Sequence, residues 1–272
     1  MDIKGKVVII TGAASGIGQA TAFALANAGA KAIGLADIDS AGLLETASGV
    51  QQRGAECLTD VVDVGSSGQL SLFFKRVEAE FGGISIVHNN AGTICGEPIW
   101  PDTSLDRIEA VINVNLKGVA FGNRLAIELL SRHAGGVIIN TASTAALGPM
   151  PVDPIYSSTK AAVVGLTQAS AGLAASHNIR VNAILPGMVD TAFINRTGDG
   201  STPAAWLNPV LENTILLTPE QIADTVLELI EDDQRQGECV VINNPKDSRH
   251  VAEVLRLRNP AEYYQHIANS LN

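Results

Sequence analysis

The chain has 272 residues, of which 46% are hydrophobic and 17% charged, a composition normal for a globular protein. Its formal net charge of −10 disfavours nucleic acid and anionic lipid as partners. The sequence contains no run of about 18 apolar residues, so we expect no membrane span. It also contains no long apolar segment near the start, so we expect no secretory signal. Three widely spaced cysteines and five scattered histidines predict neither disulfides nor a metal site, so we expect a cytoplasmic protein.

Seven short apolar segments alternate with helical segments along the chain. The predicted strands are 6–11, 31–36, 55–61, 84–89, 136–142, 179–185 and 238–242. The predicted helices are 16–29, 40–52, 66–82, 104–132, 154–176 and 219–232. Because the strands are almost continuously apolar, both faces of their sheet should be covered. The fold class predicted is α/β, a doubly wound parallel sheet of about seven strands with helices on both faces.

No linker divides this pattern, so residues 1–272 are predicted to form a single domain. Residues 190–215 break the alternation and place Phe193, Trp206 and Leu207 among glycine, proline and polar residues. A long insertion of this composition is typical of a substrate loop or lid. Residues 245–272 are predicted to be a C-terminal extension with one or two short helices.

A glycine turn follows the first predicted strand and opens a helix. Gly12, Gly16 and Gly18 allow a tight turn in which backbone N–H groups approach a pyrophosphate at a helix N-terminus, with Ser15 and Ile17 beside them. The alternative is that these glycines only serve a tight junction between strand and helix. The position of the turn after strand one favours a dinucleotide site.

Asp37 ends the second predicted strand, about twenty residues beyond the glycines. A carboxylate there can accept hydrogen bonds from the ribose hydroxyls of a dinucleotide and repels a 2′-phosphate. Position 15 is serine and position 38 is isoleucine, so no neighbouring cation is placed to receive that phosphate. We therefore predict NAD rather than NADP, with a turn-forming or capping aspartate as the alternative.

Further motifs follow in order. They are "TGAASGIG" from Thr11, "VVDV" with Asp63 and Val64, "NNAG" with Asn90, Ala91 and Gly92, "NVNLKG" with Asn115, "IINTAS" ending at Ser143, "YSSTK" from Tyr156 to Lys160, and "PGMVDT" with Pro186, Gly187, Val189 and Thr191. Over residues 4–242 the sequence resembles the short-chain dehydrogenase/reductase family, which has a Rossmann-like fold. The resemblance implies cofactor contacts at Asp63, Val64, Asn90, Ala91, Gly92, Pro186, Gly187, Val189 and Thr191.

The C-terminal part departs from the usual family pattern. After the last predicted strand the chain reads "INNPKDSRH" where many members have D-G-G. The segment "LIEDDQRQGECVVI" is similar to the 15-hydroxyprostaglandin dehydrogenase branch, which also lacks that ending. Family resemblance further implies a homotetramer or a homodimer, with the tetramer favoured, formed through the helices at 104–132 and 154–176 and, as a second contact, through helix 219–232 with the strand at 238–242.

The spacing of Tyr156 and Lys160 predicts a tuned base. Oxidation of a secondary alcohol needs a proton acceptor, but the pKa of a free tyrosine is about 10. Residues i and i+4 share one helix face, so the ammonium can favour the phenolate and lower that pKa. Tyr156 is then the general base in oxidation and the general acid in reduction. The alternative is an ordinary surface pair.

Ser143 and Asn115 complete the predicted catalytic set. The Ser143 hydroxyl, at the carboxyl end of a strand, can polarise the substrate oxygen. The resemblance implies that Asn115 holds a water that relays protons from Lys160, and that Lys160 also binds the nicotinamide ribose. Alternatively Asn115 packs within its helix. Asn90 could contact the cofactor or link strands.

The predicted function is transfer of a hydride between NAD(H) and a secondary alcohol or ketone. An apolar lining with few fixed charges favours a hydrophobic or cyclic substrate; its candidates are Leu147, Met150, Phe193, Trp206, Leu207, Val210 and Leu211. The alternatives are a non-catalytic NAD-binding sensor, since fold alone does not fix function, and a lyase or epimerase on the same fold.

Overall fold

The computed structural model describes residues 1–245, 253–257, 262 and 266. Its strands form one sheet in the order β3-β2-β1-β4-β5-β6-β7-β8. The strands are β1 (Val7–Thr11), β2 (Ala32–Asp37), β3 (Glu56–Val61), β4 (Ile86–Asn89), β5 (Gly136–Thr141), β6 (Ile179–Pro186), β7 (Cys239–Asn243) and β8 (Glu253–Leu257). The first seven pair in parallel, which confirms the seven predicted strands and their doubly wound arrangement.

Strand β8 was not predicted. It pairs antiparallel with β7 at the edge of the sheet, in the segment where the sequence suggested short helices. Val254 of this strand is exposed, whereas Leu255 is partly buried and packs against the cluster that contains Val163 and Val241. Apart from β8, Glu262 and His266, the predicted C-terminal extension beyond residue 245 lies outside the described residues.

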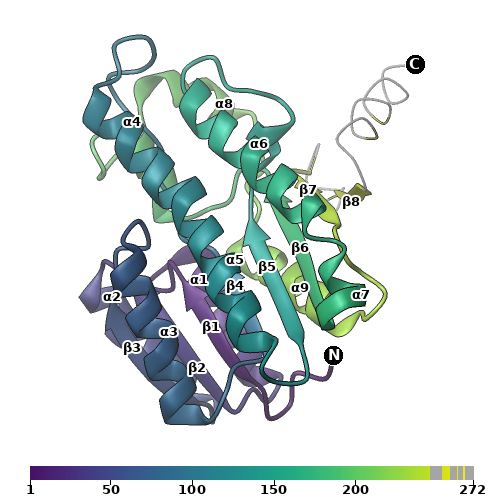
Figure 1. Ribbon diagram of the computed structural model, residues 1–272. Coiled ribbons are helices and arrows are strands. Elements are labelled where there is room, and N and C mark those ends of the chain that lie inside the picture. Colours follow the sequence, from purple (N-terminus) through teal and green to yellow (C-terminus); the bar gives the residue numbers. More distant parts are fainter. Residues whose placement is uncertain (246–252, 258–261, 263–265, 267–272) are drawn as a thin grey trace.

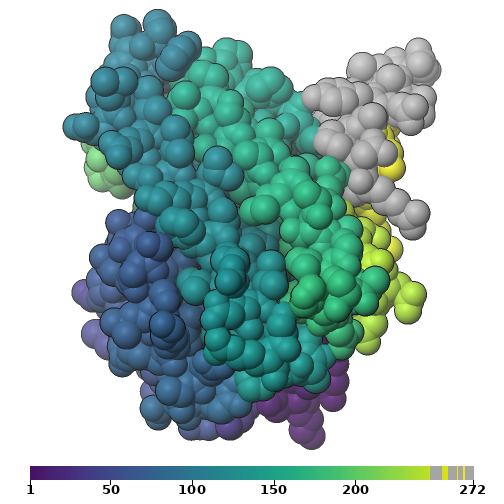
Figure 2. Space-filling model, viewed as in Figure 1, coloured from purple at the N-terminus to yellow at the C-terminus, as the bar shows by residue number. Residues whose placement is uncertain are grey.

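Helices cover both faces of the sheet (Figure 1). One face packs against α1 (Gly16–Asn27), α2 (Ser40–Gln52) and α9 (Pro219–Glu231), and the other against α3 (Ser67–Phe81), α5 (Val119–Leu130) and α6 (Pro154–Ala169). Neighbours in β1 divide accordingly, because Ile10 packs with Leu25 of α1 and Ile9 packs with Phe73 of α3. Figure 2 shows the second helical layer covering its face of the sheet.

Two of the predicted helices are divided. The segment 104–132 contains α4 (Leu105–Ile112), a π-helical stretch (Asn113–Gly118) and then α5. The segment 154–176 contains α6 and a short α7 (Leu173–His177). The π-helical stretch carries Asn115, and such local widenings of a helix occur frequently at functional sites.

The predicted lid, residues 190–215, contains three short helices: η3 (Ala192–Thr197), η4 (Ala205–Leu207) and α8 (Asn208–Glu212). It is held at both ends, because Val189 and Leu217 form a parallel bridge. The lid is therefore an ordered cover whose two ends lie side by side.

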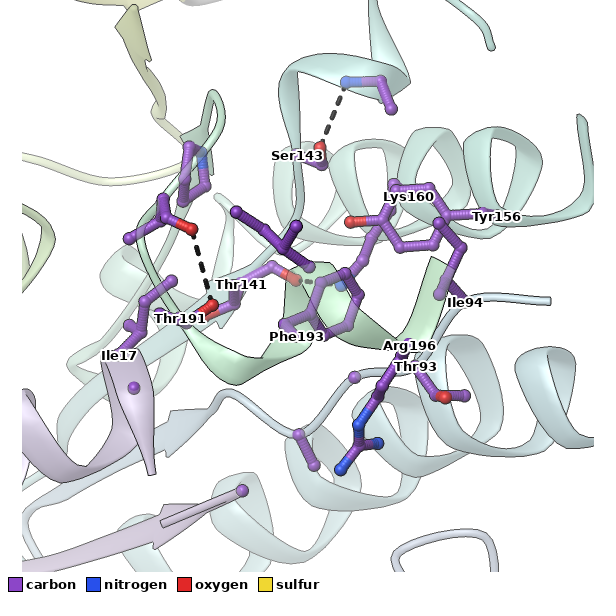
Figure 3. A pocket seen from close by; sticks show the side chains of 18 of the residues that line it. Ile17, Thr93, Ile94, Thr141, Ser143, Tyr156, Lys160, Thr191, Phe193 and Arg196 are labelled. Atoms are coloured by element: carbon purple, nitrogen blue, oxygen red, sulfur yellow. Dashed lines mark hydrogen bonds between the residues drawn. The ribbon is translucent and has the colours of Figure 1, made fainter. Parts of the chain in front are cut away.

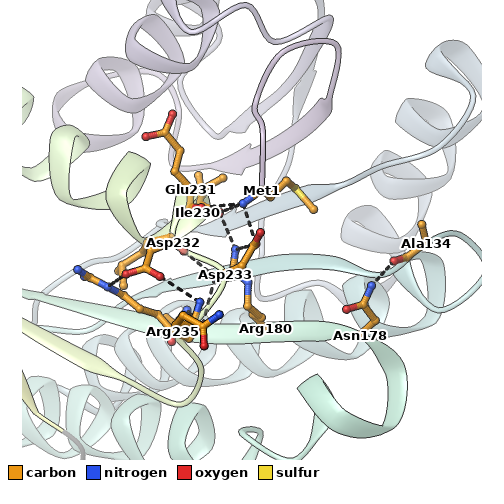
Figure 4. A network of polar contacts seen from close by, with 12 residues as sticks. Met1, Ala134, Asn178, Arg180, Ile230, Glu231, Asp232, Asp233 and Arg235 are labelled. Atoms are coloured by element: carbon orange, nitrogen blue, oxygen red, sulfur yellow. Dashed lines mark hydrogen bonds and ion pairs between the residues drawn. The ribbon is translucent and has the colours of Figure 1, made fainter.

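The C-terminal end of α9 is fixed by Arg180 of β6 (Figure 4). The buried guanidinium donates to the carbonyl oxygen of Leu229 at 2.8 Å and to that of Ile230 at 2.5 Å. These bonds occupy carbonyls that a helix end leaves without intrahelical partners. Among the described residues, no helix has the length and apolar character needed to cross a bilayer.

Candidate active site

A cavity of about 670 Å³ lies beyond the carboxyl ends of the parallel strands, beneath the lid. Its walls include every cofactor residue predicted from the sequence except Gly18, together with Ser143, Tyr156 and Lys160. Asn115 is fully buried behind this wall. Ligands of doubly wound sheets bind at this edge, where the loops after the strands converge.

The glycine turn has the close packing that glycine permits. Gly12 has φ of +65° and Gly16 has φ of +55°, the left-handed region that favours glycine. A Cβ on Gly12 would lie 2.7 Å from Ala91 Cα, and a Cβ on Gly18 would lie 2.1 Å from the Gly12 carbonyl oxygen. Gly18 therefore acts through the shape of the turn, since it lets α1 begin directly against it.

Asp37 joins the end of β2 to this turn. Its Oδ2 accepts a hydrogen bond from Ala14 N–H at 3.0 Å and its Oδ1 accepts one from Asp39 N–H at 3.1 Å. The structure thus shows the turn-forming role that the sequence left open. Each carboxylate oxygen can accept a second bond, so Asp37 retains capacity for ribose hydroxyls at the cavity wall.

Three of the four residues of the predicted catalytic set, Ser143, Tyr156 and Lys160, share one wall of the cavity (Figure 3). Tyr156 and Lys160 lie one turn apart on α6, and the Lys160 ammonium is 5.7 Å from the centroid of the Tyr156 ring. Lys160 Nζ donates to the carbonyl oxygen of Thr141 at 2.8 Å. Ser143 follows β5, lines the same cavity, and its Oγ accepts from Ala145 N–H at 3.1 Å.

Burial dominates the pKa values of this group. Desolvation raises the pKa of Tyr156 to about 12, while the Ser143 side chain acts in the opposite direction. Burial lowers the pKa of Lys160 to about 8. The sequence-based argument predicted a tyrosine pKa lowered by the lysine, but the protein's own groups leave the pKa raised, because both side chains are withdrawn from water.

Asn115 is held in a fixed orientation. Its Nδ2 donates to the Thr93 carbonyl oxygen at 2.8 Å, and its Oδ1 accepts from Thr93 N–H at 2.8 Å. Nδ2 also donates to Thr159 Oγ1 at 3.2 Å. A Cβ placed on Gly92 would lie 3.5 Å from Lys160 Nζ and 3.6 Å from Asn115 Oδ1. Both polar groups therefore border the same glycine.

A buried hydrogen-bonded chain runs beneath the cavity from β4 to the glycine turn. His88 Nε2 lies 2.9 Å from Thr141 Oγ1, and Thr141 Oγ1 donates to Asn90 Oδ1 at 3.3 Å. Asn90 Nδ2 in turn donates to the Gly12 carbonyl oxygen at 3.0 Å. Asn90 is thus a link between strands as well as part of the cavity wall. Burial lowers the pKa of His88 to about 3, so this imidazole is neutral.

Two supporting residues were missed by the sequence analysis. Asp153 caps α6 by accepting from Tyr156 N–H at 2.9 Å and also accepts from Cys95 N–H at 2.8 Å, so it positions the tyrosine. Asn244 accepts from Met188 N–H at 2.8 Å and donates to the Met188 carbonyl oxygen at 2.7 Å, so it fixes the loop after β6. An aspartate before a proline that opens a helix was a readable signal for the first. The signal for Asn244 was the segment after β7, which departs from the usual family pattern.

The remaining wall is largely apolar. Met150, Phe193, Trp206, Leu207 and Val210 line the cavity as predicted, whereas Leu147 and Leu211 do not. The Phe193 and Tyr156 rings lie 6.1 Å apart between centroids. The expectation of few fixed charges omitted one lining residue, Arg196. Within the described residues, no group of three or more metal-ligating side chains could hold a metal ion.

A model of the short chain dehydrogenase family matches residues 6–201, and the chain belongs to this family of oxidoreductases. Among particular relatives, 15-hydroxyprostaglandin dehydrogenase [NAD(+)] of Homo sapiens is 33% identical over 260 residues, 90% of this chain and 94% of that protein. The similarity to that branch therefore extends well beyond the helix and strand on which the sequence suggested it.

Other relatives act on different substrates. Galactitol 2-dehydrogenase of Agrobacterium fabrum is 39% identical over 191 residues, 70% of this chain and 73% of that protein. The crystal structure of levodione reductase matches with a TM-score of 0.80 at 30% identity, covering 88% of this chain and 96% of that chain. A 3-ketoacyl-(acyl-carrier-protein) reductase from Brucella melitensis, complexed with NADH, matches with a TM-score of 0.78 at 27% identity and covers 88% and 97%.

Proposed function

We propose that this protein transfers a hydride between NAD(H) and a secondary alcohol or ketone, with Tyr156 as general base in oxidation and general acid in reduction. The observation that carries the proposal is the convergence of Ser143, Tyr156 and Lys160 on a cavity that also contains the glycine turn and Asp37. A dinucleotide and an alcohol could therefore meet at one tyrosine. The names of two relatives include NAD(+) and NADH, which supports this cofactor.

Each polar side chain has a defined task in this reaction. Ser143 donates to the substrate oxygen as negative charge develops there, and Tyr156 Oη takes the hydroxyl proton. Bound NAD supplies the hydride acceptor and a positive charge that favours the phenolate. Lys160 adds a second positive charge, and the proton can leave past Asn115 Oδ1, which borders Gly92 together with Lys160 Nζ.

The cavity wall also supports a preference for substrate and cofactor. Phe193 lies beside Tyr156, and Trp206 and Val210 add apolar surface to the cavity wall, which favours a hydrophobic or cyclic alcohol. Asp37 retains the carboxylate that disfavours a 2′-phosphate, so NAD should bind more tightly than NADP. An NAD preference favours the oxidative direction.

For the quaternary structure we propose a homodimer ahead of a homotetramer, because β8 occupies the outer edge of β7, next to one of the two expected contacts. The mass of the purified protein in solution distinguishes these two states.

The test of function combines cofactor titration with a substrate screen. NAD and NADP are titrated separately, and secondary alcohols of increasing apolar size are then supplied with the tighter cofactor while nicotinamide absorbance is followed. The proposal predicts tighter NAD binding and turnover of apolar alcohols. Tighter NADP binding would contradict the role of Asp37, and NAD binding without turnover of any alcohol would favour a sensor.

A further inference from the structure

Arg196 is a cation of the lid with no assigned partner. It lies on η3 and lines the cavity with an exposed side chain. Within the described part of the chain, its guanidinium forms no ion pair or side-chain hydrogen bond. A guanidinium has five N–H donors in a planar fork, so a cavity-lining arginine without an acceptor is suited to an anionic ligand.

The two ends of η3 are packed closely, one against the glycine turn and the other against the loop after β4. At the start of η3, Thr191 Cγ2 lies 2.9 Å from where a Cβ on Gly16 would stand. At its end, the Arg196 carbonyl oxygen lies 2.6 Å from where a Cβ on Gly96 would stand. Arg196 is five residues past Thr191, roughly 10 Å along a 3-10 helix at about 2.0 Å per residue. An arginine side chain can cross back over much of that distance.

The guanidinium points away from the reacting groups. In Figure 3 the Arg196 side chain projects into the cavity on the side of Phe193 opposite to Ser143 and Tyr156. Thr93 lies beside it, in the loop that follows the NNAG turn. An anion bound here would therefore sit away from the alcohol carbon, beside the loop that follows β4.

Charge balance identifies the class of anion. A dinucleotide pyrophosphate carries two negative charges, while the chain has a net charge of −10 and places Asp37 and Asp63 on the cavity wall. Among the described lining residues, Lys160 and Arg196 are the cations. Lys160 is 2% exposed and donates to Thr141. Arg196 is thus the cation that remains to neutralise a pyrophosphate.

We propose that Arg196 binds the pyrophosphate of the dinucleotide and so fastens the lid over the cofactor, an inference that rests on the proposed NAD site. Its planar fork matches two phosphate oxygens, which makes the contact specific as well as electrostatic. The contact would also hold η3, which carries Phe193 beside Tyr156, in place over the cofactor. Cofactor binding would in this way shape the apolar wall before the alcohol enters.

Calorimetric titration of Arg196→Gln with three probes tests this proposal. NAD and ADP-ribose both contain the pyrophosphate, and adenosine does not. We expect the variant to bind NAD and ADP-ribose about 10-fold more weakly and adenosine as the wild type does. Arg196→Lys should recover part of the loss, since it restores the charge without the fork.

Arg107→Gln is the matched control. Arg107 lies nearby, and its Nη1 donates to the Cys95 carbonyl oxygen at 3.1 Å, but it does not line the cavity. The Arg107→Gln substitution removes the same charge from the same region but outside the cavity. We therefore expect wild-type affinity for all three probes. Added salt should weaken ADP-ribose binding less in Arg196→Gln than in either the wild type or this control.

Several results would overturn the proposal. These are unchanged NAD affinity in Arg196→Gln, an equal loss of adenosine, a loss confined to NADP, and a raised KM for the alcohol with cofactor affinity unchanged. The last result would instead place a substrate carboxylate on Arg196. If the wild type and Arg196→Gln bind NAD equally, the proposed contact between Arg196 and the pyrophosphate is wrong and the proposed function stands. If the wild type binds no dinucleotide, both fail.

Discussion

His88 should make the folded protein sensitive to acid. This side chain is fully buried on β4, and burial lowers its pKa to about 3 from an ordinary value of 6.5. The unfolded chain therefore takes up a proton below about pH 6.5 that the folded protein does not bind until about pH 3. The sign follows: stability contributed by neutral His88 is present above pH 6.5 and is lost as pH falls through the range between these values.

The expected size is large enough to measure. One pKa unit corresponds to about 1.4 kcal/mol, so the titration of His88 alone should lower the free energy of unfolding by about 2 kcal/mol between pH 7 and pH 5. This figure requires only that the pKa of the folded state lies well below 5. His88→Gln keeps an N–H donor that can reach Thr141 Oγ1 but does not titrate.

The assay is urea unfolding of the wild type and of His88→Gln at pH 7 and at pH 5. We expect the variant to lose about 2 kcal/mol less stability than the wild type between the two pH values, whatever its stability at pH 7. Titration of the other histidines is common to both proteins and cancels. Equal acid sensitivity of the two proteins would refute the argument that His88 is held neutral by burial.

Two further substitutions test the geometry of the cavity. Ser143→Ala should lower kcat/KM for alcohol oxidation about 100-fold and move upward the pH at which the rate rises, because the side chain that lowers the Tyr156 pKa is removed; an unshifted midpoint would contradict this role. Gly18→Ala should weaken NAD binding at least about 10-fold, because its Cβ would lie 2.1 Å from the Gly12 carbonyl oxygen and force the turn open. Titration calorimetry measures this loss, and wild-type affinity in the folded variant would show that the turn adjusts.

The fold was predictable because its strands carry a simple signal. Continuous apolar runs separated by helical segments indicate a parallel sheet covered on both faces, and all seven predicted strands lie in that sheet. Strand β8 was missed because its five residues carry no clear period, and they become a strand only by pairing with the edge of β7. The π-helical stretch around Asn115 likewise has no signature of its own, since its hydrogen bonds to Thr93 depend on a loop 22 residues away.

The residues of the candidate site likewise fall into those that a local motif predicts and those that depend on the folded structure. Residues that recur in short motifs, such as Gly12, Ser143 and Tyr156, could be placed at the carboxyl edge of the sheet from the order of the strands. Arg196 could not, because its direction depends on how η3 lies over the cavity. The raised pKa of Tyr156 was missed for a related reason: a four-residue spacing reports the nearness of Lys160 but not the depth of burial of both groups.

The comparison of Tyr156→Phe with the wild type, using NAD and an accepted secondary alcohol, tests the proposed chemistry most directly. The substitution removes one hydroxyl from a buried ring and leaves the glycine turn, Asp37 and the apolar wall in place. We predict that kcat falls about 1,000-fold while the affinity for NAD stays within a few-fold of the wild type. Turnover close to that of the wild type would contradict the assignment of Tyr156 as the proton acceptor.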